Sequence, residues 1–163
     1  MGAGLSWRMP IDAAHLHLML NHLPVIGSPI LLLILTIGLV RGQREVVTLA
    51  LALIIALAVA TAVVYLTGEP AEELVERAPW FPKGLAESHE ESATVSFVAT
   101  LVTGVLAVAA LVFRRGDRSR RWLPRVVWGL LIVSTLLLGW TAWSGGQIRH
   151  DEIRSGASVA PGS

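Results

Sequence analysis

Four long apolar segments alternate with polar connections along the chain. They run from about residue 21 to 40, 46 to 66, 93 to 113 and 126 to 145, and none has a Lys, Arg, Asp or Glu in its interior. A helix of about 20 apolar residues spans the roughly 30 Å hydrocarbon core of a bilayer. Strands of a membrane barrel would alternate in polarity and be about half as long. The pattern therefore predicts an all-α fold, a bundle of four transmembrane helices.

Polar flanks extend each apolar segment. With these flanks, we expect helices at about residues 14–40, 45–67, 89–113 and 123–146. They would form a single four-helix membrane domain over residues 1–154, followed by a Gly- and Ser-rich tail, residues 155–163, that is expected to be disordered. Hydrophobic residues make up 53% of the chain, which agrees with a protein that lies mostly in lipid.

The longest connection lies between the second and third segments. Its stretch 70–77, PAEELVER, is typical of a short amphipathic helix, with Pro70 in the first turn where proline is tolerated. The following stretch 79–82, PWFP, is not expected to form regular structure, and its aromatic rings suit the headgroup level of a membrane. We therefore expect a short helix that acts as a lid over one mouth of the bundle.

Charge separates the connections into two groups. The first and third connections contain eight arginines and two acids, whereas the second connection and the two ends contain five basic residues and ten acids. Cytoplasmic loops of membrane proteins are enriched in Lys and Arg. The chain is therefore expected to be a multi-pass protein of the bacterial inner (cytoplasmic) membrane, with both termini in the periplasm.

This topology brings all five histidines to the periplasmic face. His15, His17 and His22 lie where the first helix begins, His89 where the third begins, and His150 about one turn beyond the end of the fourth. Ionisable residues inside a membrane usually face the bundle interior, and this favours an inward position for His22. Histidines at an interface can also serve only to anchor a helix, an interpretation that suits His15.

Two hypotheses describe a cofactor at this face. The chain has no cysteine, which excludes thiolate sites, iron–sulfur clusters and covalently attached haem. In the first hypothesis two imidazoles from different helices bind haem b, His22 pairing with His89 or His150. His17 lies in the same group, and Arg149 is placed to pair with a cofactor carboxylate or with an acid of the lid.

In the second hypothesis imidazoles and carboxylates bind a divalent metal such as Zn, Fe or Cu. The candidate ligands are His22, His89, His150, Glu69, Glu73 and Glu90. The chain has no His-Glu-x-x-His motif and no pair of Glu-x-x-His helices, so this hypothesis depends on the grouping alone.

A third hypothesis is a cofactor-free accessory or structural subunit of a larger membrane complex. The expected partners are the lipid bilayer, other membrane-complex subunits and electron carriers. The arginine-rich connections are too short and too poor in aromatic residues to indicate nucleic-acid binding. No Ser or Thr has an evident general base and orienting group nearby, so the pattern indicates no catalytic nucleophile. Whether the protein is an enzyme stays open.

Three sequence blocks carry a resemblance to a known family. The blocks LHLMLNHLPVIG, YLTGEPAEELVE with the later HEESA, and GGQIRHDEI resemble those of a bacterial family of uncharacterised four-helix inner-membrane proteins. More distantly, the chain is similar to membrane proteins with periplasmic-side histidines and some likeness to b-type cytochromes. The resemblance implies a functional set made of His17 or His22, Glu69, Glu73, His89, Arg149 and His150. Haem binding is implied only by the more distant similarity to b-type cytochromes.

Overall fold

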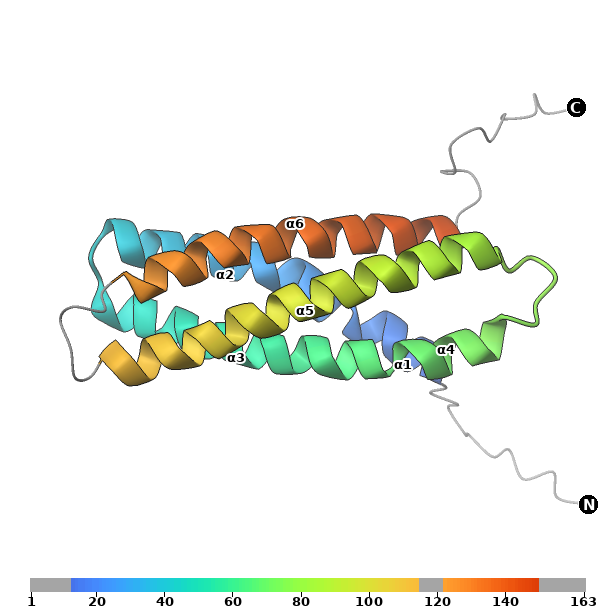
Figure 1. The fold of residues 1–163 in the computed structure, drawn as a ribbon, viewed down its shortest axis with the longest axis horizontal. Helices are drawn as coiled ribbons and strands as arrows, with labels where there is room; N and C mark the ends of the chain where they lie inside the picture. Colours follow the sequence, from blue (N-terminus) through green and yellow to red (C-terminus); the bar gives the residue numbers. More distant parts are fainter. Residues whose placement is uncertain (1–12, 115–121, 150–163) are drawn as a thin grey trace, which may run out of the picture.

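The computed structural model describes residues 13–114 and 122–149, and all regular structure within them is helical (Figure 1). The helices are α1 (Ala13–Leu20), α2 (His22–Val40), α3 (Arg44–Leu66), α4 (Gly68–Val75), α5 (Lys83–Arg114) and α6 (Leu123–Arg149). The four long helices, α2, α3, α5 and α6, confirm the predicted all-α four-helix bundle.

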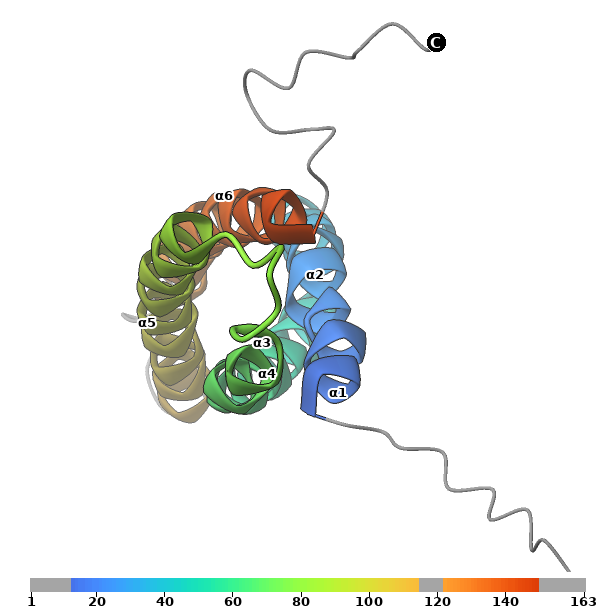
Figure 2. The same ribbon diagram turned by 90° about the vertical axis from the view of Figure 1, so that its right-hand side faces the viewer.

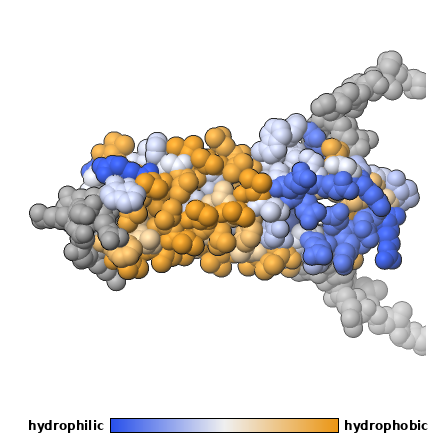
Figure 3. All heavy atoms as spheres, in the orientation of Figure 1, coloured by the Kyte–Doolittle hydropathy of each residue, from blue (hydrophilic) through white to orange (hydrophobic). Residues whose placement is uncertain are grey.

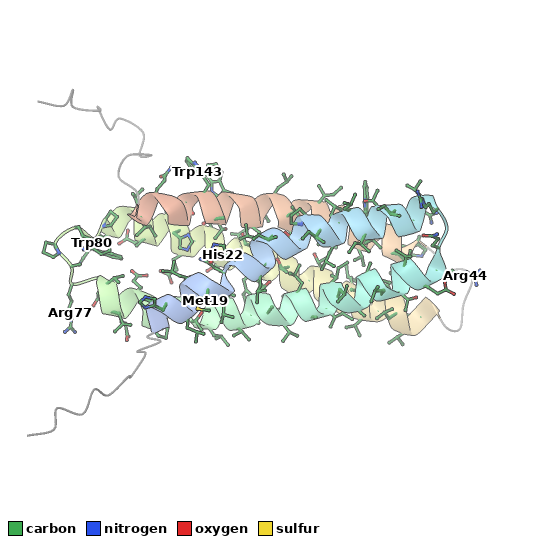
Figure 4. All side chains as sticks on the ribbon, turned by 180° about the vertical axis from the view of Figure 1, so that it is seen from behind. Met19, His22, Arg44, Arg77, Trp80 and Trp143 are labelled. Atoms are coloured by element: carbon green, nitrogen blue, oxygen red, sulfur yellow. The ribbon has the colours of Figure 1, made fainter. Side chains whose placement is uncertain are left out.

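The long helices form a ring in which sequence neighbours are antiparallel. α2 packs against α3, α3 against α5, α5 against α6, and α6 closes the ring against α2 (Figure 2). One end of the bundle carries Arg41, Arg44 and Arg125, and we call it the arginine end. The other end carries the described histidines, α4 and the start of α5, and we call it the histidine end. Arg44 and Arg77 mark the two ends in Figure 4.

The outer surface of the bundle is apolar between its two ends. Four stretches, Ala14–Val40, Arg44–Val75, Lys83–Phe113 and Leu123–Ile148, are long and apolar enough to cross a membrane. Val40, Leu66 and Leu136 are 81%, 73% and 70% exposed. Figure 3 shows this apolar surface as a band between polar ends. Soluble proteins rarely expose so large a continuous apolar surface, so this band is suited to lipid.

The stretch expected as one helix over 14–40 is interrupted. Asn21 forms a turn between α1 and α2. Pro24, three residues later, has no N–H to donate to the Leu20 carbonyl, which weakens the helix at this point. As a result α1 leaves the axis of α2 and packs against α4 (Figure 1).

The connection between the second and third long helices also differs in detail from its expected bounds. α4 begins at Gly68, directly after the turn residue Thr67. α5 begins at Lys83, where the Pro82 carbonyl accepts hydrogen bonds from the N–H groups of Leu85 and Ala86. The segment 76–82 crosses the histidine end between them (Figure 2). The role of this connection as a lid stays a prediction.

The bundle interior changes from apolar to polar along its length. From the middle to the arginine end it is an apolar cluster that includes Leu35, Leu51, Ile54, Val127 and Leu131. From the middle to the histidine end the buried polar residues are Ser28, Thr61, Ser96, Thr100, Thr103, Ser134, Ser144 and Gln147. Small and hydroxyl side chains let membrane helices approach closely and bond to each other. The histidine end therefore combines close packing with polarity.

Candidate functional site

The histidine end holds four of the five histidines within the described residues. His15, His17 and His22 lie on α1 and at the start of α2, and His89 lies on α5. Arg149 is the last residue of α6, and only its backbone is described. His150 lies outside the described residues, so its predicted part in the site stays a prediction.

His17 is held by the junction of α3 and α4. Its Nδ1 lies 3.1 Å from Thr67 Oγ1. The Thr67 hydroxyl donates its proton to the Val64 carbonyl at 2.7 Å, so it accepts from His17 and Nδ1 carries the hydrogen. The neutral imidazole then has its lone pair on Nε2. A half-buried histidine is thus fixed with one nitrogen available to a ligand.

His89 is held in the same way by α6. Its Nδ1 lies 3.1 Å from the Thr141 carbonyl oxygen and 3.1 Å from Ser144 Oγ. A carbonyl only accepts, so Nδ1 donates here too and the lone pair is on Nε2. The ring lies against Gly145, where an added Cβ would be 2.8 Å from His89 Cε1. Gly145 therefore makes the space that the imidazole occupies.

His22 occupies a different position from the inward one that the pattern favours. It is exposed at the junction of α1 and α2 (Figure 4), and its Nδ1 donates to the Leu18 carbonyl at 2.8 Å. The turn at Asn21 changes the direction of the chain just before His22, and the buried face of α2 begins instead at Pro24 and Ser28. His15 is also exposed.

The predicted carboxylate ligands do not gather around these imidazoles. Glu69 and Glu73 on α4 and Glu90 on α5 are all exposed. Within residues 13–114 and 122–149 there is no group of three or more His, Asp or Glu that could hold a metal ion. The metal hypothesis therefore gains no support from the described part of the chain, and its ligand His150 is outside that part.

His17 and His89 are the two partly buried histidines of the described residues. They are close enough for a charge on one imidazole to act on the other. His17 belongs to the packed pair α1 and α4, and His89 to the packed pair α5 and α6. Each ring is half-buried and donates through Nδ1. This arrangement leaves the Nε2 nitrogens of two histidines on different helices as candidate ligands.

A series of hydroxyl contacts joins α5 to α6 below His89. Ser92 Oγ lies 3.2 Å from Ser144 Oγ, and Ser96 Oγ lies 2.7 Å from Thr141 Oγ1. Deeper in the bundle, Thr103 Oγ1 lies 3.0 Å from Ser134 Oγ. These contacts fix α6 relative to α5, so the two partners of His89 on α6 are held in register with it.

Acidic side chains surround the outside of this end. Seven glutamates lie between residues 69 and 91, with Arg77 and Lys83 as the basic residues of the same stretch. Glu72 on α4 interacts electrostatically with Glu87 and Glu90 on α5. Figure 3 shows the resulting polar surface at the histidine end. The surroundings of the site are therefore negative.

Comparisons with known proteins return no relative: no family model matches the chain, and no curated protein or solved structure matches it. The family resemblance carried by the three sequence blocks therefore stays a prediction.

Sequence reasoning missed the residues that hold the two imidazoles. Thr67, Thr141, Ser144 and Gly145 contact His17 or His89 across helix boundaries. The sequence places Thr141, Ser144 and Gly145 within about two turns of the end of the fourth apolar segment, and so at the same end of the bundle as the histidines. This position was the one available indication of their role. Spacing within a helix does not give the rotation of two helices about their axes, and this rotation decides which side chains meet.

Proposed function

We propose that the chain is an integral membrane protein that binds haem b at its histidine end, through Nε2 of His17 and Nε2 of His89, and takes part in electron transfer. The observation that carries this proposal is the pair itself. Two half-buried imidazoles lie on different helix pairs at one end of the bundle, near enough for their charges to interact, and each donates its Nδ1 hydrogen to a protein acceptor.

The orientation of the two rings supports a ligand role. Histidines that bind a metal almost always donate their other ring N–H to a carboxylate, carbonyl or similar acceptor, which fixes the tautomer and raises the basicity of the ligating nitrogen. Thr67 supplies such an acceptor for His17, and the Thr141 carbonyl supplies it for His89. Unliganded histidines also make such bonds, but two that are held in this way at the same end of one bundle are suited to a shared ligand.

The number of ligands favours haem over a single metal ion. A bound haem would need at most two ligands from the protein, since the porphyrin supplies four, and His17 and His89 would provide them. A protein-bound zinc ion takes three or four protein ligands, and no such group exists among the described residues. Bound haem would supply one-electron chemistry. The chain's own residues would hold the iron, fix both imidazoles and limit access of water.

The placement in the membrane belongs to the same proposal. The arginine end carries the basic residues Arg41, Arg44 and Arg125, and the histidine end carries most of the acids. Because cytoplasmic loops of membrane proteins are enriched in Lys and Arg, the arginine end lies in the cytoplasm and the histidine end in the periplasm. Electron carriers would then reach the site from the periplasmic side.

The test is a reduced-minus-oxidised absorption spectrum of the full chain, purified in detergent from haem-replete cells. A b-type difference band with haem in a near one-to-one ratio to protein is the expected result. A flat spectrum together with no bound metal by elemental analysis would exclude the proposal. Recovery of the colourless protein in a large assembly in mild detergent would then favour the accessory-subunit alternative.

A further inference from the structure

Two short helices form a separate unit at the histidine end. α1 and α4 each have 8 residues. A single residue joins each of them to its long helix: Asn21 lies between α1 and α2, and Thr67 lies between α3 and α4. α1 and α4 pack against each other, and we call them together the α1–α4 unit. The bond from His17 to Thr67 ties the unit to its own junction.

Both junctions are weak points of the helical backbone. Pro24 leaves the Leu20 carbonyl without its usual donor next to Asn21. At Thr67 the backbone N–H is shared between the Val63 and Val64 carbonyls, at 3.2 and 3.1 Å. The Thr67 hydroxyl also bonds to Val64, and a side chain that enters the hydrogen-bond ladder is a known cause of helix bending. The chain therefore bends most easily at these two residues.

The α1–α4 unit is held on the side of α2 and α3, and has little besides the connection 76–82 to hold it against α5 and α6. Within the described residues, it makes little direct contact with α5 and α6, although those two helices pack closely on each other. The charges between the two parts also repel. Glu72 on α4 acts on Glu87 and Glu90 of α5, all of the same sign. Repulsion between like charges favours a separated position of the unit.

We propose that the α1–α4 unit is a hinged arm that swings about Asn21 and Thr67, and so moves the far end of α4 toward and away from the start of α5. The arm carries His17, while α5 and α6 hold His89 in place through Thr141 and Ser144. His17 is bonded to the pivot residue Thr67, so the swing displaces the far end of α4 much more than this imidazole and opens the mouth of the site. As a means of admitting haem it rests on the proposed function, but the motion itself does not.

The test is a distance measurement between spin labels by pulsed electron paramagnetic resonance. The chain has no native cysteine, so label positions can be introduced singly. One label pair spans the hinge, Glu73→Cys on α4 with Ser88→Cys on α5. A control pair lies within the bundle, Val63→Cys on α3 with Val95→Cys on α5. All four positions are exposed.

The variant that moves the arm is the double substitution Glu87→Gln with Glu90→Gln, which removes the repulsion without changing side-chain size. A helix of 8 residues is about 12 Å long, so a swing of about 20° moves its far end by about 4 Å. We expect the Glu73–Ser88 distances to be broadly distributed and to shorten by about this amount in the double variant. The Val63–Val95 distances stay narrow and unchanged.

The hinge is refuted if the Glu73–Ser88 distances are as narrow as those of the control pair and do not move in the double variant. The labelled chain is measured as purified, with its haem content read separately from the absorption spectrum. If the Glu73–Ser88 distances shift in the double variant but the chain has no haem band, the proposed function alone is refuted. A haem band in a chain with immobile distances would refute the hinge alone.

Discussion

At the scale of single residues, the imidazole nitrogen that carries the hydrogen decides which nitrogen can bind a ligand. The sequence places five histidines at one end of four helices, and the tendency of intramembrane ionisable residues to face the bundle interior favours His22 as the inward residue. In the structure His22 bonds to its own helix, whereas His17 and His89 bond to neighbouring helices. Those bonds depend on the packing of α1 on α4 and of α5 on α6. No pattern within one segment could have predicted them.

A single methyl group tests the position of His89. In Gly145→Ala the added Cβ would lie 2.8 Å from His89 Cε1 and 3.1 Å from Nδ1, so the imidazole must shift and its bonds to α6 are weakened. We expect haem content to fall by about tenfold, the loss that about 1.4 kcal/mol of binding energy gives. The measurement is haem per protein after purification. Gly139→Ala on the same helix is the matched control, because nothing lies within 4 Å of its Cβ.

At the scale of helices, the apolar pattern predicts the four long elements well, because each must match the thickness of a bilayer. The turn at Asn21 was less predictable, since Pro24 can bend a helix without ending it. The direction of α1 after the turn depends on its packing with α4, which lies about 50 residues later in the chain. Local sequence patterns do not predict contacts between segments that are this far apart in the chain.

The closest approach of two helices gives a prediction at this scale. In Gly104→Ala on α5 the new Cβ would lie 2.5 Å from the Cβ of Ala58 on α3, and neither atom can rotate away. Such overpacking costs roughly 1–3 kcal/mol, so we expect a lower melting temperature in detergent. The second substitution Ala58→Gly removes the clash and should restore most of the loss. An unchanged melting temperature in Gly104→Ala would contradict the packing of α3 on α5.

Considered as a whole, the molecule has opposite ends joined by an apolar band. One end is rich in arginine, the other in histidine and glutamate, and the interior changes from apolar to polar in the same direction. The sequence predicts the charged ends and the apolar band directly, because charge and hydropathy do not depend on packing. The site within the polar end follows only from the structure.

The orientation of the whole molecule can be tested by labelling from one side. In a cysteine-free chain, Glu76→Cys at the histidine end and Gln43→Cys at the arginine end are both exposed. With an impermeant maleimide and intact cells whose outer membrane is permeabilised, we expect Glu76→Cys to react at once and Gln43→Cys only after lysis. The reverse order would place the histidine end in the cytoplasm.

The most direct test of the central claim is electron paramagnetic resonance of the oxidised protein. We predict the low-spin signal of haem iron held by two imidazoles. His17→Ala and His89→Ala should each lose the signal or convert it to high spin, while His22→Ala, which removes an exposed histidine, should keep it. A low-spin signal that survives in His17→Ala or His89→Ala, or that disappears in His22→Ala, would contradict the assignment of His17 and His89 as the ligand pair.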